Sequence, residues 1–333
     1  MSKYDVYAIG NALVDIEYHI TPDRLIELEI EKGVMTLIDE QRQNSLKAQL
    51  EETHEKMACG GSAANSVIAL AQMGAKTYFD CRVSADMAGQ FYARDLQDSG
   101  VDSRLESKMT GQGVTGKCLV FVTPDADRTM NTFLGVSAEL DISDVNAEAI
   151  KNSHCIYIEG YLASADNTRD AAIEARKMAE ASEVKTALTL SDPNMVKFFR
   201  ENLEAMIGDK IDLLFANEDE ANELSGCANF NDTLAYLRRI SRHFAITRGA
   251  EGAVLFNGVE TIEVDPFKVR AIDTLGAGDM FAGAFLYGLT QEMSFEQAGK
   301  LASRASSKIV SQYGPRLDAE TTQGLLRSFN AGN

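Results

Sequence analysis

The sequence predicts an α/β protein with a mainly parallel central sheet covered by helices, and a small β-sheet standing apart from it. From about residue 155 onward, short apolar segments that resemble strands alternate with amphipathic segments that resemble helices. This order is typical of a parallel sheet with helical connections. Residues 14–38 and 110–134 instead show strand-like alternation without a long helix between. That pattern favours antiparallel strands with one solvated face, so we expect them to form the small sheet as a cover.

The expected elements follow from apolar runs and from 3.6-residue periodicity. We expect strands at residues 4–9, 117–123, 155–158, 186–191, 213–216, 243–247 and 253–256. We expect helices at residues 62–73, 86–98, 168–181, 219–224, 233–241, 278–289 and 294–312. The chain has only five prolines and no charge block that would separate two domains. We therefore interpret residues 1–333 as a single domain, with cover segments at about 12–40 and 108–136.

Composition excludes several classes of protein. The chain has 333 residues and a formal net charge of −18, because 50 acidic residues exceed 32 basic ones. Such a chain repels polyphosphate backbones, so we expect no nucleic-acid partner. It contains no apolar run of 18 residues and begins without a basic and apolar leader, so we expect no membrane partner and a cytoplasmic location. Five scattered cysteines and four scattered histidines indicate neither a disulfide framework nor a zinc site.

One glycine motif is interpreted as a false signal. Residues 111–118 (GQGVTGKC) satisfy GxGxxG and nearly satisfy the P-loop pattern. Both motifs need a helix after the glycines, so that helix amides meet the phosphates. Here a strand-like run, LVFVT, follows instead. The segment therefore predicts a hairpin or loop.

The strongest chemical signal is the string DTLGAGD at residues 273–279, followed by the apolar helix MFAGAFL. Small residues at a helix start let a ligand approach the backbone, and the amides and helix dipole there favour an anion. Asp279 in that first turn is placed to accept a proton from a hydroxyl beside the anion. Phosphoryl transfer needs these two parts together. The alternative for a lone GAGD is an aspartate that only caps a helix.

This string resembles the C-terminal signature of the ribokinase-like (PfkB-type) carbohydrate and nucleoside kinases. Four further segments resemble motifs of that family and occur in its order: residues 10–15 (GNALVD), 60–65 (GGSAAN), 217–220 (NEDE) and 247–252 (TRGAEG). The resemblance covers nearly the whole chain. It implies a ribokinase-like three-layer α/β/α sandwich with a small β-sheet lid.

The resemblance also implies roles for individual residues. Asp279 would be the general base, and the amides of Gly276, Ala277 and Gly278 would form the anion hole. The implied substrate-binding residues are Asn11, Leu13, Asp15, Asn65 and the hinge pair Gly60 and Gly61. A carboxylate and a carboxamide suit sugar hydroxyls. Read without the resemblance, Gly60-Gly61-Ser62 would be a loop ending in a helix cap.

The resemblance also implies which residues contact the nucleotide. The resemblance implies ATP contacts at Asn217, Glu220, Thr247, Arg248, Gly249, Gly252 and Ser303. Glu220 and Asn217 would organise Mg²⁺ through water, whereas the simpler interpretation is a solvated acidic helix start. Arg128 in the cover would neutralise phosphate charge or be an ordinary surface arginine. A monovalent cation such as K⁺ is also consistent with the resemblance, through backbone groups near Asp273 and Gly314.

The substrate is less clearly indicated. Asn11, Leu13 and Asp15 follow an N-x-L-x-D spacing seen in adenosine kinases, and residues 120–134, 158–162 and 188–193 resemble bacterial proteins grouped with them. A nucleobase needs apolar or aromatic walls, for which Tyr161, Met35 and Leu37 are candidates. Ordinary core packing is the alternative for each. The segment Asp192-Pro193-Asn194 resembles the D-P-N-x-R of sugar-kinase relatives, but Val196 stands in place of the arginine, which disfavours acidic sugars.

We therefore expect an ATP- and Mg²⁺-dependent kinase acting on a primary hydroxyl of a nucleoside or sugar, with adenosine as the best single substrate. A ribose or fructose kinase and a catalytically silent nucleotide-binding relative are the alternatives. A dehydrogenase is disfavoured, because the only GxGxxG precedes a strand. The oligomeric state, monomer or homodimer, is left open.

Overall fold

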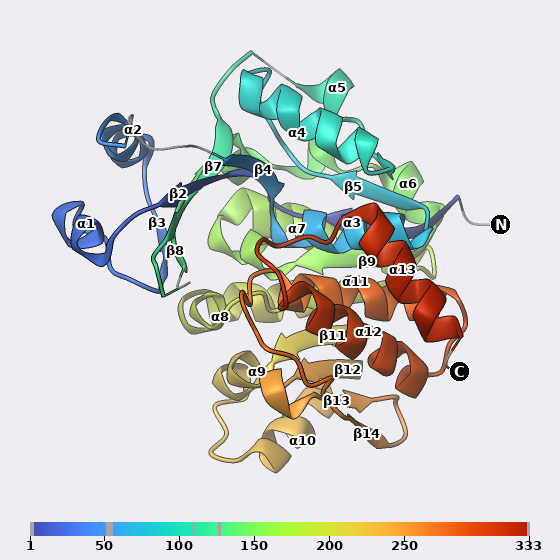
Figure 1. The fold of residues 1–333 in the computed structure, drawn as a ribbon. Helices are drawn as coiled ribbons and strands as arrows, with labels where there is room; N and C mark the ends of the chain where they lie inside the picture. Colours follow the sequence, from blue (N-terminus) through green and yellow to red (C-terminus); the bar gives the residue numbers. More distant parts are fainter. Residues whose placement is uncertain (1–2, 51–55, 110, 126–127, 332–333) are drawn as a thin grey trace.

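The structure is a computed structural model that describes residues 3–50, 56–109, 111–125 and 128–331. Residues 110, 126 and 127 of the second expected cover segment lie outside this part of the chain. The fold has three layers, a large sheet between two sets of helices, and a small sheet at one side (Figure 1). The predicted ribokinase-like sandwich with a mainly parallel central sheet is confirmed.

The large sheet has nine strands in the order β14-β13-β12-β11-β10-β9-β1-β5-β6. All neighbours from β12 to β6 pair in parallel, and only β13 and β14 are antiparallel at one edge. The central strands are continuous apolar runs because helices cover both of their faces. Their bounds are β1 Tyr4–Ile9, β5 Thr77–Asp80, β6 Val101–Asp102, β9 Ser153–Glu159, β10 Lys185–Thr189, β11 Ile211–Asn217, β12 Ser241–Thr247, β13 Ala253–Phe256 and β14 Thr261–Val264.

Two groups of helices bury the faces of this sheet (Figure 1). One face carries α3 Ser62–Met73, α11 Ala277–Thr290, α12 Phe295–Ile309 and α13 Ala319–Asn330. The other carries α6 Ala147–Lys151, α7 Asp166–Ala181, α8 Pro193–Ile207, α9 Glu218–Ser225 and α10 Phe230–Ile240. Helices α4 Met87–Asp98 and α5 Leu105–Lys108 lie near the β5–β6 edge. None of the described helices is long and apolar enough to cross a bilayer.

Most expected elements of the main body occur where the sequence predicts them, and three, β1, β13 and α3, have the expected bounds. The helices α5, α6, α8 and α13 and the strands β5, β6 and β14 were not predicted. The GxGxxG segment runs into strand β7, which begins at Thr115, and no helix follows its glycines, as expected.

The small sheet has the order β3-β8-β7-β2-β4. Its strands are β2 Leu13–His19, β3 Met35–Leu37, β4 Lys56–Gly60, β7 Thr115–Val122 and β8 Arg128–Gly135. The expectation of antiparallel strands is correct for only part of this sheet, because β2 pairs with β7 and β3 pairs with β8 in parallel. Only the β2–β4 and β7–β8 pairs are antiparallel. Strand β4 lies outside the expected cover segments of 12–40 and 108–136.

The solvated face that we expected on this sheet is also largely covered. Two short helices, α1 Pro22–Glu27 and α2 Glu40–Ala48, lie beyond its outer side (Figure 1). Leu25 and Leu46 of these helices are buried in the same cluster as Ile16 and Phe121 of the sheet. The inner side faces a cleft toward the main body. The alternating pattern therefore reflects one face packed on helices and one face lining a cavity.

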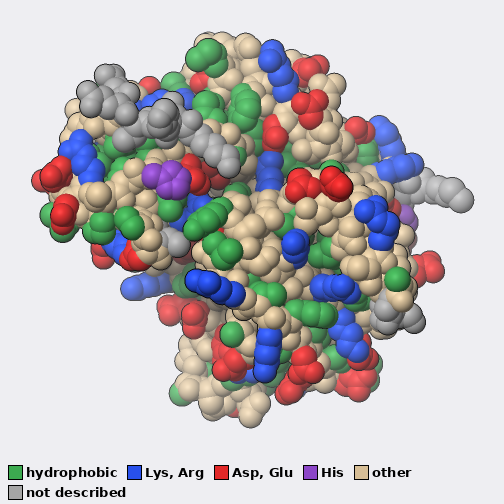
Figure 2. Space-filling model, viewed as in Figure 1, with side chains coloured by type: hydrophobic (Ala, Val, Ile, Leu, Met, Phe, Trp, Pro, Cys, Tyr) green, Lys and Arg blue, Asp and Glu red, His purple; other side chains and the backbone are tan. Residues whose placement is uncertain are grey.

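Charge is dispersed over the surface. On the face drawn in Figure 2, lysine and arginine side chains are scattered among aspartates and glutamates, without a continuous basic area. This agrees with the net charge of −18 and with the absence of Lys/Arg clusters in the sequence.

Candidate active site

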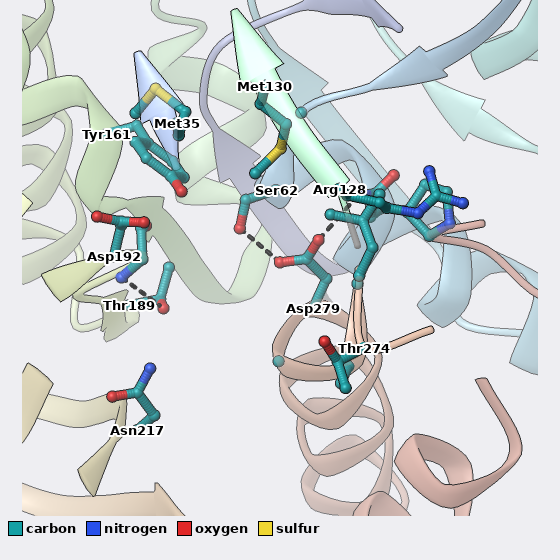
Figure 3. A pocket seen from close by; sticks show the side chains of 18 of the residues that line it. Met35, Ser62, Arg128, Met130, Tyr161, Thr189, Asp192, Asn217, Thr274 and Asp279 are labelled. Carbon is teal, nitrogen blue, oxygen red and sulfur yellow. Dashed lines mark hydrogen bonds between the residues drawn. The ribbon is translucent and has the colours of Figure 1, made fainter. Parts of the chain in front are cut away.

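A cleft of about 1040 Å³ opens between the large sheet and the inner side of the small sheet. The last residues of four adjacent parallel strands line it, Glu159 of β9, Thr189 of β10, Asn217 of β11 and Thr247 of β12. Parallel strands end at the same edge of a sheet, so polar side chains from distant parts of the chain meet there. The start of α11 enters the same cleft (Figure 3).

Asp279 lies in the first turn of α11 and is held by two side chains of α3. Ser62 Oγ donates to Asp279 Oδ1 at 2.6 Å (Figure 3), and Asn65 Nδ2 donates to Oδ2 at 2.8 Å. Burial raises the pKa of Asp279 to about 6, while the two hydrogen bonds and the charge of Arg316 act against this rise. A general base works best with a pKa near the operating pH. Asp279 is therefore placed and tuned to accept a proton in the cleft.

The backbone before Asp279 forms the helix start that the sequence predicts. Gly276 is the N-cap of α11 and has φ +75°, where a Cβ would lie 2.4 Å from the carbonyl oxygen of Pro315. The amide of Ala277 already donates to Thr274 O at 3.2 Å. Among the described residues, no acceptor faces the amides of Gly276 and Gly278, and the Cβ position of Gly278 is open space. Two of the three expected amides are thus available to an anion.

Asp15 of β2 directs an unpartnered carboxylate into the cleft, since no described residue donates a hydrogen bond to it. Burial raises its pKa to about 7, against the charges of Arg316 and Arg128. A Cβ on Gly60 would lie 2.4 Å from both carboxylate oxygens, so only glycine fits beside it. Gly60 does not itself line the cleft.

Glu159 is a buried site residue to which the sequence analysis gave no role. Its Oε2 accepts from Ala63 N at 2.8 Å, and its Oε1 accepts from Asn11 Nδ2 at 3.2 Å. Burial raises its pKa to about 7. The carboxylate therefore ties the segment that enters β2 to the start of α3. Gly61, with φ +98° and its Cβ position 2.4 Å from Asn11 O, lies between these two points.

The NxxE motif forms a capping box at the start of α9. Asn217 Nδ2 and N donate to the two carboxylate oxygens of Glu220 at 2.7 and 3.0 Å, and Glu220 N donates to Asn217 Oδ1 at 2.8 Å. Glu220 is only 5% exposed, so the interpretation as a solvated acidic helix start is wrong. Burial raises its pKa to about 7. Each oxygen keeps a lone pair, and the side chain lines the cleft, which fits an outer-shell contact to hydrated Mg²⁺.

The segment 247–252 is split between the cleft and the body of the protein. Thr247 and Gly249 line the cleft. Arg248 points to α9, where it pairs with Glu218 at 2.7 Å, and it also pairs with Glu251 at 2.8 Å. Gly252 has φ +89°, and its Cβ position lies 2.1 Å from Val264 O, so a glycine is required by the turn. These contacts give Arg248 and Gly252 structural roles in this arrangement.

Ser303 is also turned away from the cleft. It is 8% exposed, and its Oγ donates to Asp265 O at 3.2 Å. The serine thus fastens α12 to the segment after β14, and it does not line the cleft.

Arg128 is not an ordinary surface arginine. Its side chain is 9% exposed and pairs with Asp273 Oδ2 at 2.8 Å and with Glu17 Oε2 at 3.0 Å. Asp273 also accepts from the amides of Leu275 and Gly314. The guanidinium thus connects the small sheet to the loop before α11, at the place where the sequence analysis considered a monovalent cation.

The inner side of the small sheet supplies apolar walls. Three candidates for the base site, Met35 and Leu37 of β3 and Tyr161 in the 3₁₀ helix after β9, line the cleft (Figure 3 labels Met35 and Tyr161). Val120 and Met130 extend this wall. Val196, on α8, is 1% exposed and packs in the core, so its position offers no cation to the cleft.

A buried carboxylate with a raised pKa beside unpaired helix amides is the arrangement that phosphoryl transfer to a hydroxyl group needs, and the fold and family show a phosphotransferase acting on hydroxyl groups. Comparison with known proteins identifies the family. Residues 33–322 match the model of the pfkB family carbohydrate kinases, and the chain belongs to that family. It is a sugar or nucleoside kinase.

Relatives of both substrate types resemble the chain. The 5-dehydro-2-deoxygluconokinase of Listeria monocytogenes is 26% identical over 82% of this chain and 86% of its own length. The crystal structure of a probable sugar kinase from Rhizobium etli CFN 42 is 33% identical, with a TM-score of 0.90 over 100% of this chain and 99% of that one. Adenosine kinase from Sinorhizobium meliloti is 33% identical, with a TM-score of 0.88 over 98% and 99%.

Proposed function

We propose that this kinase transfers the γ-phosphoryl group of ATP to the 5′-hydroxyl of a nucleoside, with adenosine as the best single substrate, giving AMP and ADP. One observation carries the proposal. The cleft combines the carboxylate of Asp15 and the amide of Asn65 with apolar side chains that include Met35, Met130 and Tyr161. Hydroxyl ligands alone suit a free sugar, whereas a neighbouring apolar wall suits a nucleobase.

In the proposed reaction, Asp15 and Asn65 orient the ribose, and Asp279 accepts the proton of the 5′-hydroxyl as its oxygen attacks the γ-phosphorus. The bond between the 5′-oxygen and phosphorus forms while the bond to the bridging oxygen of ADP breaks. The free amides of Gly276 and Gly278 stabilise the charge on the transferring group. Arg128 adds positive charge from the small sheet once it exchanges Asp273 for phosphate oxygens.

Glu220 and Asn217 would hold Mg²⁺ through water molecules. The ion, when bound, neutralises phosphate charge. The small sheet would act as a lid that excludes water, turning at Gly61 and at the backbone that Glu159 anchors.

A sugar kinase is the second candidate. It is favoured by the relatives named 5-dehydro-2-deoxygluconokinase and by the probable sugar kinase from Rhizobium etli. In that case Asp279 and the helix start keep their roles, and the apolar wall serves a different group.

The test is ADP release by the purified protein with Mg-ATP and each of adenosine, inosine, guanosine, ribose, fructose and 5-dehydro-2-deoxygluconate. Tyr161→Ala is compared with Tyr313→Ala, a change at an exposed tyrosine that does not line the cleft. Turnover that favours adenosine and a rise in its KM only in Tyr161→Ala support the proposal. Turnover on a free sugar or sugar acid alone refutes the nucleoside assignment.

A further inference from the structure

A short segment between α12 and α13 touches the motif at residues 273–279 at two points and helix α3 at a third. Gly314 N donates to Asp273 Oδ2 at 2.8 Å. The backbone of Pro315 packs so closely against Gly276 that a Cβ on the glycine would lie 2.4 Å from the Pro315 oxygen. Arg316 reaches past α11 to Asn65 on α3. We call residues 314–316 the brace segment.

Arg316 bridges two helices behind the reacting carboxylate. Its Nε donates to Asn65 Oδ1 at 2.8 Å, and its Nη1 donates to Asp95 Oδ2 of α4 at 2.5 Å. Its side chain is 17% exposed, and it does not line the cleft. Its Nη2 is buried with no acceptor among the described residues. A buried donor without an acceptor is costly, so a purely structural role explains this arginine poorly.

The bond from Arg316 determines which way the Asn65 amide faces. The oxygen of the amide must accept from the guanidinium, because arginine has no acceptor. The amide nitrogen is therefore directed at Asp279 Oδ2, which lies 2.8 Å away. If the amide turned over, its nitrogen would face Nε and its oxygen would face a carboxylate, and both contacts would be repulsive.

The charge of Arg316 acts on the same carboxylate. Arg316 supplies the positive charge that opposes the rise in the pKa of Asp279. Five further ionisable groups that interact electrostatically with Asp279 are acidic or phenolic: Asp15 on β2, Tyr157 and Glu159 on β9, Tyr161 in the following turn and Glu220 on α9. Loss of the Arg316 charge would leave the effect of burial less opposed, and burial favours protonated Asp279, which cannot accept a proton.

We propose that Arg316 is a positioning residue for phosphoryl transfer, which holds Asn65 so that Asp279 is both correctly aimed and kept ionised. This inference rests on the proposed function of Asp279 and extends it to a residue outside the cleft. It has two parts that can be tested separately. The orientation of the Asp279 carboxylate depends on the hydrogen bond through Asn65, and its ionisation depends on the charge of Arg316.

The experiment compares Arg316→Met, which removes charge and donors at similar length, with Arg316→Lys, which keeps the charge but not the planar donor pair. Arg200→Met, at an ion pair on α8 that does not line the cleft, is the control. Turnover and KM are measured on the best substrate from pH 5 to 9, together with thermal unfolding of each variant.

Arg316→Met should lower kcat by about 10- to 100-fold, with the KM for ATP within about threefold, since misplacement of a reacting group costs this much. The acid limb of its pH profile should move upward by roughly half a unit to one unit, because a nearby positive charge is lost. Arg316→Lys should keep the acid limb of the unmodified protein, while its kcat stays low. In an Asn65→Ala background, Arg316→Met should add little further loss of kcat.

Three results would overturn the inference. The first is a folded Arg316→Met protein whose kcat and acid limb are unchanged. The second is an equal factor of loss in kcat when Arg316→Met is made with Asn65 and with Asn65→Ala. The third is an Arg316→Met protein whose melting temperature falls while its kinetics stay unchanged. If Arg316→Met does not fold, Arg316→Lys and Asp95→Asn replace it, and unmodified kinetics in both overturn the inference. A silent unmodified protein instead refutes the proposed function, so the two failures are distinguishable.

Discussion

Replacing Asp279 by asparagine should stop turnover and, at the same time, stabilise the substrate-free protein. The proposed proton acceptor is lost, so kcat should fall by about 10²- to 10⁴-fold, the usual contribution of a positioned base. The same carboxylate is costly to keep ionised, because burial raises its pKa from 3.8 to about 6. Asparagine has nearly the same shape and carries no charge to desolvate.

The size of the stabilisation follows from the pKa. A rise of about two units at roughly 1.4 kcal/mol per unit lowers the free energy of unfolding by up to about 3 kcal/mol. Below about pH 4 the carboxyl is protonated in both the folded and the unfolded state, so this cost is absent. It grows between about pH 4 and pH 6 and is complete above pH 6. Water in the open cleft makes 3 kcal/mol an upper limit.

The assay is thermal unfolding of the unmodified and Asp279→Asn proteins at pH 8.0 and pH 4.5, together with ADP release at pH 8.0. At about 2 °C per kcal/mol, the variant should melt up to roughly 6 °C higher at pH 8.0 but only up to about 2 °C higher at pH 4.5, where about one third of the cost is present. Asp170→Asn, at an exposed ion pair on α7, is the matched control and should show no such pH dependence.

Two results would refute this reasoning. Near-full turnover by Asp279→Asn would show that another group accepts the proton. A melting difference that is the same at both pH values, or an Asp279→Asn protein that is less stable at pH 8.0, would show that the carboxylate is not strained by burial.

Three further changes have distinct expected outcomes. Arg128→Met should raise the KM for ATP by about tenfold and leave that for the acceptor nearly unchanged, because the guanidinium lies at the loop before α11; equal effects on both substrates in steady-state kinetics would contradict this. Tyr161→Ala should raise the KM for adenosine by at least about tenfold through loss of the apolar wall, with no change for ATP; an unaltered adenosine KM would remove Tyr161 from the base site. Glu220→Gln should raise the Mg²⁺ concentration for half-maximal rate by about tenfold, measured at saturating ATP, and an unchanged requirement would leave Glu220 as a helix cap alone.

The helix start with Asp279 could be predicted because it is formed by contiguous residues, 273–279. A run of small residues and an aspartate at a helix start predicts an anion site beside a carboxylate, and α11 begins at Ala277, next to the predicted start at Gly278. The N-cap glycine at φ +75° and the bounds of α3 were likewise accessible from local patterns.

The partners of that helix start were not predictable, because they come from distant parts of the chain. Ser62 lies 217 residues before Asp279 in the sequence. Arg316 comes from the loop after α12. An isolated Arg between Pro and Leu carries no periodicity or motif. Glu159 is one more residue of an apolar strand until the fold places it beside Ala63 N.

The small sheet shows a second limit of prediction from the sequence. Alternation predicts a strand with two unlike faces but does not say which neighbour it pairs with, so the parallel β2–β7 pairing was missed. Nor does it say what covers the apolar face. The six-residue α1 and the nine-residue α2 are too short for a clear helical period, and they bury that face.

The two sheets come from different stretches of the chain, and this separates what the enzyme does from what it acts on. The helix start and the base belong to residues 276–279, whereas most of the apolar wall belongs to residues 35–37 and 118–134. Exchange of those two stretches for those of a relative with another preference, with Arg128 kept in place, should change the acceptor and leave residues 276–279 untouched. The residues proposed for the reaction and most of those proposed for acceptor choice can therefore be varied separately.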